Sequence, residues 1–279
     1  DALLSRGLGD VYKRQPRKKL ISNNKHRGSW LFHDLSLTFH RWKYIAYGMQ
    51  FKTNLIKGKL LKRYKRFLAD VMLEDGTEVI AHCPNPGSML GLASAGTSVW
   101  LEPNNDPKKK LKYGWRLAEQ QDRMVCIDTS IANIVVKEAL QKKEILELSY
   151  QDFKPEVKYS DNSRIDFLLS SSSQQTYLEI KSVTLMREKG IVEFPDSITK
   201  RGSKHLEDLS KMVTSGYQSI LLFLCMRSDA SRVRIAADLD SIYDATIRDA
   251  LASGVQLICY DTHVTKFGVR LGKPLLIEI

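Results

Sequence analysis

Ser163-Arg164-Ile165-Asp166-Phe167-Leu168-Leu169, a polar run at 170–175, and Thr176-Tyr177-Leu178-Glu179-Ile180-Lys181-Ser182-Val183-Thr184 form the stretch that decides the fold. Two runs rich in β-branched, aromatic and aliphatic residues flank a Ser/Gln segment, which predicts a β-hairpin. Because side chains alternate along a strand, Glu179 and Lys181 share one face while Ile180 points into the core. The hairpin would bring Asp166 beside Glu179.

Charges in the middle of two apolar strands are costly unless something compensates them. A Mg²⁺ or Mn²⁺ ion held by Asp166 and Glu179 would do so, because Mg²⁺ prefers oxygen ligands from carboxylates, phosphate and water. Lys181 would then neutralise a phosphate or orient a water. The alternative is an ion pair of Glu179 with Lys181 or Arg164, with Asp166 capping a turn. The residues alone leave both interpretations open.

The composition excludes some classes of protein. The chain has 279 residues, enough for one large or two small domains, and no run of 18 apolar residues, so we expect no membrane span. Its four cysteines are widely spaced and form no Cys-x-x-Cys pair. This spacing predicts buried free thiols in a reducing compartment, and we expect a cytoplasmic protein.

The formal net charge is +11, and much of it lies in residues 1–48, which hold ten Lys/Arg against three Asp/Glu. Ser5 to Gln15 resembles a translated sequencing adaptor, and 16–48 show no clear helical or strand period. We therefore predict that residues 1–48 are a non-native extension from sequencing or gene calling, and that Met49 is the natural start. A basic, acid-poor transit peptide is the alternative.

Residues 49–117 contain short strand-like runs separated by Gly and Pro turns, which predicts a small antiparallel OB-like barrel. Basic residues crowd its first strands, including Lys62, Arg63, Lys65 and Arg66. They would follow DNA phosphates, while bases could stack on Tyr64, Phe67, Trp100 or Trp115. Alternatively, the aromatic residues are core and the basic ones a solvated edge that prevents aggregation.

Residues 118–279 predict a second domain with a mixed α/β sheet. The expected elements are a helix at 129–143, a strand at 153–159, the hairpin, a helix at 197–215, a strand at 219–226, a helix at 239–252 and a strand at 255–260. Two successive strand–helix–strand passages favour a right-handed α/β sheet.

Glu138 borders the apolar stripe of the first predicted helix. It is a candidate further acid of the metal site, and Glu156 is another. The alternative for Glu138 is a solvent-side pair with Lys142, four residues on.

The second predicted helix carries Arg201, Lys204, Asp208 and Lys211 along one side, with His205 adjoining. A basic stripe beside the acidic site would grip DNA phosphates. An ordinary solvated helix face is the alternative.

The order of elements from 129 onwards resembles the PD-(D/E)xK nuclease core. More closely, the chain resembles the sugar fermentation stimulation protein A (SfsA) family from about Leu55 to the C-terminus. The matching motifs are Arg63–Val71, His82–Met89, Glu156–Tyr159, Ser163–Phe167, Glu179–Leu185 and Arg201–Leu206. Ile165 stands where the nuclease motif has proline, but that proline is not a ligand.

The resemblance implies an α/β protein with an OB-like barrel followed by a restriction-endonuclease-like mixed α/β sheet domain. It also implies a bacterial cytoplasmic protein that binds double-stranded DNA without marked sequence preference, with a regulatory link to maltose and other sugar use. The expected DNA-binding set is Lys62, Arg63, Lys65, Arg66, Arg164, Arg201, Lys204 and His205.

Three hypotheses follow. In the first, the protein binds DNA, with Mg²⁺ or Mn²⁺ at Asp166 and Glu179 meeting one phosphate. In the second, it is a metal-dependent nuclease whose catalytic residues are Asp166, Glu179, Lys181 and Glu138, and the ion would be held by the two acids and the Ile180 carbonyl. In the third, the barrel alone binds single-stranded RNA. The sequence leaves open whether the protein forms a homodimer.

Overall fold

The structure is a computed structural model that describes residues 48–159 and 163–279. The interpretation of residues 1–47 lies outside the described residues. The described residues belong to one compact unit, which contains both predicted domains. Within the described residues, no helix is both long enough and apolar enough to span a membrane.

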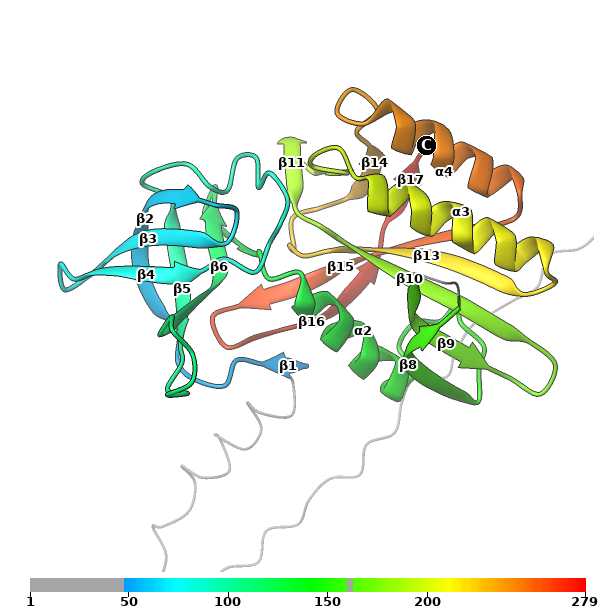
Figure 1. Ribbon diagram of the computed structural model, residues 1–279, viewed down its shortest axis with the longest axis horizontal. Helices are drawn as coiled ribbons and strands as arrows, with labels where there is room; N and C mark the ends of the chain where they lie inside the picture. Colours follow the sequence, from blue (N-terminus) through cyan, green and yellow to red (C-terminus); the bar gives the residue numbers. More distant parts are fainter. Residues whose placement is uncertain (1–47, 160–162) are drawn as a thin grey trace, which may run out of the picture. The chain divides into compact units, whose positions relative to one another are not determined.

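The N-terminal part of this unit is a closed five-strand barrel, as predicted (Figure 1). Its strands pair in the order β4-β3-β2-β5-β6, and a parallel pairing of β4 with β6 closes it. The strands are β2 (Ile56–Tyr64), β3 (Leu68–Leu73), β4 (Glu78–His82), β5 (Ser98–Pro103) and β6 (Tyr113–Gln120), with β7 (Arg123–Cys126) paired to β6. The sequence places the domain boundary at residue 117. Strand β6 continues past this residue, and β7 lies entirely beyond it.

Two of the aromatic residues that could stack on bases lie in different surroundings. Trp115 is fully buried and donates its indole N–H to the Leu117 carbonyl at 2.8 Å, so it is a core residue and cannot stack on a base. Phe67 is 46% exposed and stacks on His82 with ring centroids 6.5 Å apart.

The C-terminal part is built on a seven-stranded sheet with the order β1-β16-β15-β13-β10-β9-β8. Its strands are β1 (Met49–Gln50), β8 (Asp152–Lys158), β9 (Arg164–Ser170), β10 (Gln175–Val183), β13 (Gln218–Cys225), β15 (Gln256–Thr265) and β16 (Gly268–Pro274). The central strands β10, β13 and β15 are parallel, and the flanking pairs are antiparallel. The predicted mixed α/β sheet is therefore confirmed.

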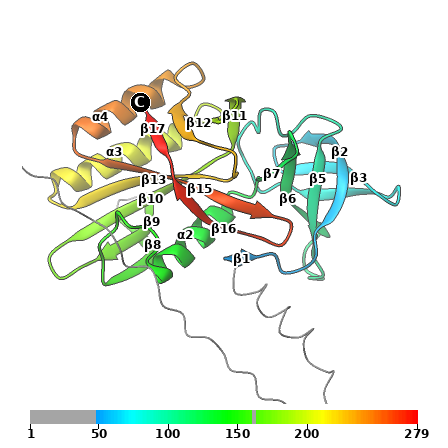
Figure 2. The same cartoon turned by 180° about the vertical axis from the view of Figure 1, so that it is seen from behind.

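Three helices cover this sheet: α2 (Ser130–Lys142) on one face, and α3 (Lys200–Thr214) and α4 (Ser241–Ala252) on the other (Figure 1). Viewed from behind, the paired strands β15 and β16 lie in front (Figure 2). The Thr199 hydroxyl accepts the Gly202 N–H at 3.1 Å and so caps α3. This cap explains why α3 begins at Lys200 and not at 197, as the sequence predicts.

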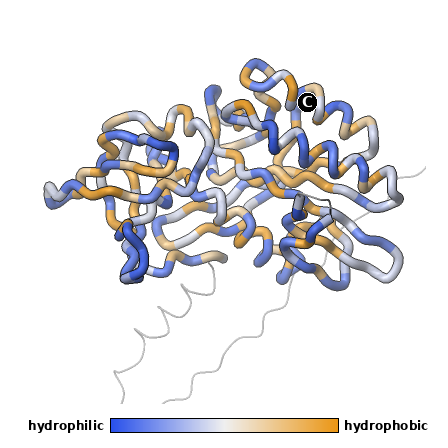
Figure 3. Tube along the Cα trace, viewed as in Figure 1, coloured by the Kyte–Doolittle hydropathy of each residue, from blue (hydrophilic) through white to orange (hydrophobic). Residues whose placement is uncertain are grey.

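Strand β13 shows why the sheet needs helices on both faces. Ile220, Leu222 and Leu224 pack into the core on the α2 side, and Leu221 and Phe223 into the core under α3 and α4. A strand buried on both faces reads as a continuous apolar run. Figure 3 shows such hydrophobic positions along the strands, whereas α3 alternates between hydrophilic and hydrophobic turns.

A second, four-stranded sheet has the order β11-β12-β14-β17. It consists of β11 (Leu185–Glu188), β12 (Ile191–Phe194), β14 (Arg232–Ile235) and β17 (Leu276–Glu278). The sequence pattern does not predict this sheet. Its β12 leads directly into the loop 195–199, which places the first turn of α3 near the site described next.

Candidate functional site

The β9–β10 pairing brings Asp166 and Glu179 together. The last paired residues are Leu178 and Phe167. Beyond them, the Asp166 carboxylate takes the place of a main-chain acceptor and receives the Ile180 N–H at 2.7 Å. The predicted hairpin therefore forms and puts the two acids on neighbouring strands.

The Asp166 carboxylate is held on both oxygens. Oδ2 accepts the Ile180 N–H, and Oδ1 accepts the Asn133 side-chain amide of α2 at 2.7 Å. Burial, followed by the negative charge of Glu179, raises the pKa of Asp166 to about 6, although both hydrogen bonds oppose the shift. A carboxyl with this pKa is poised to gain from a nearby cation.

Glu179 is buried and only one of its oxygens is used. Oε1 accepts Lys181 Nζ at 2.6 Å and also contacts His205 Nδ1. Oε2 is buried and has no hydrogen-bond partner among the residues that the structure describes. Burial raises the pKa of Glu179, but Lys181 and His205 more than offset this effect, so its pKa lies below the ordinary value. Glu179 is therefore an ionised acid with one oxygen left for a ligand.

His205 lies inside the site and not on its surface. Arg201 donates its Nε–H to His205 Nε2 at 3.2 Å, so Nδ1 carries the proton and donates it to Glu179. The sequence predicts His205 as a DNA-binding residue; in the structure its ring is buried, because α3 packs it against the Glu179 carboxylate. His205 orients an acid.

These residues line a cavity of about 750 Å³, which we call the acid pocket. The other charged groups lining it are Glu156, Lys158, Arg164 and Arg201. Glu156 has a left-handed backbone (φ 55°) and lies across from Asp166, between the pairs Pro155–Phe167 and Val157–Ile165. Apart from Glu156 and the two central acids, the charged lining is basic, which suits a phosphate.

Glu138 does not join this site. It forms an ion pair with Lys142 and lines a different cavity with Gly48 and Arg270. The structure therefore places Glu138 away from Asp166 and Glu179, contrary to the placement that the sequence predicts. Asn133, five residues earlier on the same helix and so on a different side of it, contacts Asp166 instead.

Arg63, which the sequence predicts as a DNA-binding residue, forms hydrogen bonds within the protein. Its guanidinium donates to the carbonyls of Asn85, Gly87 and Ser88 at 2.8, 2.9 and 3.3 Å, and Nε donates to the Arg66 carbonyl. With its donors used in this way, it holds the loop after β4 in place. Asn85, in that loop, is itself buried.

The remaining predicted basic residues are exposed. Lys62 pairs with Asp70 at 3.2 Å, and Lys65 and Arg66 form a turn with positive φ angles of 49° and 63°. On the other domain, Lys204 is exposed on α3, and Arg164 is exposed at the acid pocket. Their positions are compatible with binding phosphate.

Sequence reasoning missed Asn133. A polar residue on a helix otherwise rich in buried apolar positions was the only signal available, and its partner lies 33 residues away.

Four buried side-chain polar atoms lack a partner among the described residues: Tyr159 OH, Glu179 Oε2, Ser182 Oγ and Tyr243 OH. Two belong to β10, and the charge of Glu179, after burial, raises the pKa of both tyrosines. No group of three or more His, Cys, Asp or Glu side chains in the described residues is arranged around a common metal position. A cation with two carboxylates and several water or phosphate ligands, as Mg²⁺ prefers, still fits the unpartnered Glu179 oxygen beside Asp166.

Two family models match the chain. The model described as the SfsA N-terminal OB domain matches residues 61–127, and the sugar fermentation stimulation protein RE domain matches residues 130–268. Together they cover most of the described chain.

Similar proteins agree with these models. Sugar fermentation stimulation protein homologs from Ruegeria pomeroyi and Pseudoalteromonas atlantica are 50% and 46% identical over 230 and 231 residues. The matches cover 81% of this chain, and 100% and 98% of the relatives. A solved structure of Pyrococcus furiosus SfsA in complex with Ca²⁺ has a TM-score of 0.76 at 23% identity, covering 84% of this chain and 99% of that one.

Proposed function

This chain belongs to the sugar fermentation stimulation protein family, and from that premise we propose that it binds the phosphodiester backbone of DNA at the acid pocket. Binding is largely independent of sequence, because the pocket offers charge for phosphates and no ordered set of groups for base edges. Asp166 and Glu179 would hold a divalent cation, which would supply positive charge for one phosphate.

The observation that carries this proposal is the buried, unpartnered Oε2 of Glu179 beside the Asp166 carboxylate. Two acids this close repel each other and would repel a phosphate. A cation between them reverses both effects, and the calcium named for the archaeal structure agrees with a divalent ion in this fold. Arg164 and Lys158 at the pocket add attraction for the neighbouring backbone.

Glu179 Oε2, the Asp166 carboxylate and the Ile180 carbonyl are the groups that would hold Mg²⁺ or Mn²⁺. The ion supplies a Lewis acid that neutralises phosphate charge. Lys181 holds Glu179 Oε1, and Asn133 and the Ile180 N–H hold Asp166, so the ligand oxygens are fixed in advance.

The test is a gel shift with the full chain, a labelled DNA duplex and Mg²⁺, Ca²⁺ or EDTA. We expect a shift that requires the cation and weakens steeply with salt. Asp166→Ala should lose the dependence on the cation. A shift of equal strength with EDTA, or one unchanged by Asp166→Ala, would contradict the proposed site.

Hydrolysis of DNA is the second candidate function. The specific observation that favours it is that Lys181 joins the two acids in one pocket, since its ammonium group can also stabilise charge on a phosphate undergoing attack. In a site used only for binding, Lys181 would serve only to hold Glu179.

Incubation of the full chain with supercoiled plasmid and Mg²⁺ or Mn²⁺ tests this second function. Nicking that is lost in both Asp166→Ala and Lys181→Met supports hydrolysis. If DNA binds with cation but stays intact over long incubation, the protein is a binder.

The family name adds a further part to the proposal. Regulation of sugar use, including maltose, would follow from DNA binding in the bacterial cytoplasm. The four cysteines are free and buried, as expected in a reducing compartment.

A further inference from the structure

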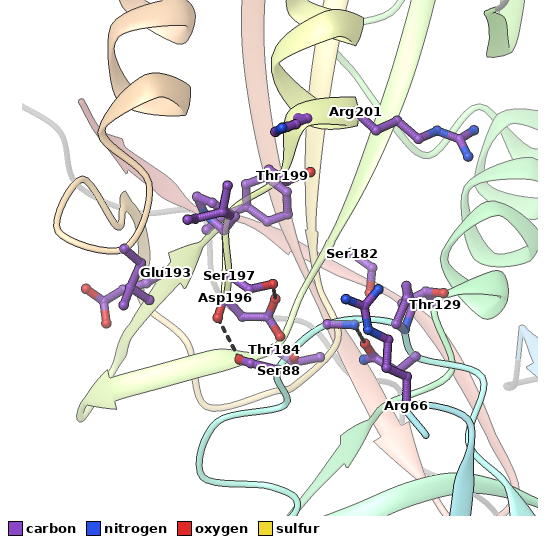
Figure 4. A pocket seen from close by; sticks show the side chains of 18 of the residues that line it. Arg66, Ser88, Thr129, Ser182, Thr184, Glu193, Asp196, Ser197, Thr199 and Arg201 are labelled. Carbon is purple, nitrogen blue, oxygen red and sulfur yellow. Dashed lines mark hydrogen bonds between the residues drawn. The ribbon is translucent and has the colours of Figure 1, made fainter. Parts of the chain in front are cut away.

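A second cavity of about 1060 Å³ continues from the acid pocket and lies between the barrel and the C-terminal domain. We call it the junction groove. Both cavities are lined by Pro86, Thr129, Ser182, Phe194 and Arg201, so they share a wall. Figure 4 shows Arg66 of the barrel and Arg201 of α3 on opposite sides of it, with Thr129 and Ser182 between them.

Hydrogen bonds between the two domains fix this groove. Ser88 Oγ donates to the Asp196 carbonyl at 2.6 Å (Figure 4), and the Met89 N–H donates to the Asp196 carboxylate at 3.0 Å. The loop held by Arg63 is thus fastened to the loop before α3. The groove therefore exists without a ligand to order it.

The charges of the groove favour an anion. Arg66 and Lys200 are exposed and form no ion pair within the described residues. Two acids, Glu193 and Asp196, line the groove. Glu193 is buried, and its charge is neutralised by Arg187 at 2.7 Å and Arg234 at 3.0 Å. The free positive charge at the surface of the groove exceeds the free negative charge, and it lies next to the acid pocket.

The groove also has an apolar lining that a double helix would not use. Pro86, Phe194, Pro195 and Ile198 line it, and Ile198 is 72% exposed. The faces of nucleobases are covered in a duplex but free in a single strand, where they pack on apolar and aromatic side chains. Cations for phosphates and apolar groups for bases in one groove are the lining expected for an unpaired strand.

We propose that the junction groove binds an unpaired nucleic-acid strand that continues from the phosphate held at the acid pocket. The inference rests on the proposed function and narrows its substrate to DNA with a single-stranded segment or end. Arg66 and Arg201 contact its phosphates, and Ile198 packs against a base. Because the barrel supplies Arg66 and the other domain supplies Arg201 and Ile198, neither domain alone completes the groove.

Fluorescence anisotropy with the full chain in Ca²⁺ buffer tests this proposal, with strand integrity checked on a denaturing gel. The probes are a mixed-sequence single strand, the same sequence as a blunt duplex, and that duplex with a 3′ or a 5′ single-stranded extension. Because only an unpaired strand offers free base faces to the groove, we expect the single strand and at least one extended duplex to bind about tenfold more tightly than the blunt duplex.

Two variants separate the contacts. Arg66→Glu should weaken single-strand binding and reduce its salt dependence by about one phosphate contact, with little effect on the blunt duplex. Ile198→Ser should weaken single-strand binding without changing the salt dependence. Lys108→Glu is the matched control, because Lys108 is exposed and lines neither cavity.

The outcomes distinguish the two proposals. Equal affinity for the blunt duplex and the single strand, or equal weakening of both by Arg66→Glu, would overturn the single-strand assignment and leave DNA binding intact. Absence of binding to every probe would overturn the proposed function itself. An effect of Lys108→Glu as large as that of Arg66→Glu would also overturn the assignment, because the attraction would then be a property of the whole surface.

Discussion

The main-chain N–H of Ile180 donates to the side chain of Asp166 at 2.7 Å, just beyond the last β9–β10 pair, Leu178 with Phe167. A carboxylate from one strand thus occupies the place of a carbonyl in the ladder. The same contact fixes the Asp166 carboxylate in the lining of the acid pocket. The site is therefore a local interruption of the sheet.

The substitution Asp166→Asn should remove the cation site and preserve the fold. The amide oxygen of Asn can still accept the Ile180 N–H, and loss of the charge relieves repulsion from Glu179. We expect Mn²⁺ affinity, measured by calorimetry, to fall by more than about tenfold, with a melting temperature at pH 8 equal to or above that of the wild type. Unchanged Mn²⁺ affinity would exclude Asp166 as a ligand.

The pKa of Asp166 predicts how stability and cation binding depend on pH. Folding raises this pKa from 3.8 to about 6, so the protonated carboxyl is favoured in the folded state. Its contribution to stability is fully present below about pH 3.8 and is lost as pH rises through about 6. Cation binding needs the ionised form, so affinity should rise through pH 6 and level off above it. Calorimetry between pH 5 and 8 measures this rise, which Asp166→Asn should abolish.

His205 should act as a positioning residue for Glu179. In His205→Asn, the Asn side-chain N–H can replace the imidazole Nδ1–H as donor, whereas His205→Ala removes the donor. We expect Mn²⁺ affinity to stay near wild type in the first variant and to fall by about 10–100-fold in the second. Nitrogen NMR of the wild type should show the Nδ1–H tautomer, and an Nε2–H tautomer would contradict the assigned contacts.

Gly87 should be intolerant of a side chain. A Cβ at this position would lie 2.5 and 2.6 Å from the Asp196 carboxylate oxygens. Gly87→Ala should therefore displace the junction between barrel and sheet and cost about 1–3 kcal/mol in urea denaturation. The double variant Gly87→Ala, Asp196→Ala should recover part of this loss. Gly114→Ala is the control, because its nearest neighbour is the flexible Arg116 side chain at 3.3 Å.

Arg227 should be the most costly arginine to remove. It is fully buried, binds Asp229 at 2.7 and 2.9 Å, and joins Gln120 of the barrel to the Thr184 carbonyl at 2.8 and 3.1 Å. Arg227→Ala should cost about 3–5 kcal/mol, since it leaves buried polar partners unpaired. Arg248→Ala, which breaks the exposed pair with Asp244, should cost less than about 1 kcal/mol. Similar costs for both would refute the role given to Arg227.

The local elements of the fold could be predicted from the chain alone. Alternation of apolar residues identifies β9 and β10, and an unbroken apolar run identifies β13, because strand geometry translates directly into sequence period. The order of helices and strands, together with the motifs around Asp166 and Glu179, is sufficient for the family. The small sheet of β11, β12, β14 and β17 could not be predicted, because its strands are short and most of their partners are distant in sequence.

The sequence by itself determined the two-domain fold and the pairing of Asp166 with Glu179, because both depend on patterns within short stretches. Only the tertiary structure decided which polar residues surround those acids. Asn133 and His205 reach the site from helices on opposite faces of the sheet, Glu138 turns away, and Arg63 binds a loop. The physical reason is that a side chain's partners are set by how helices and loops pack in space, and no local period encodes that packing.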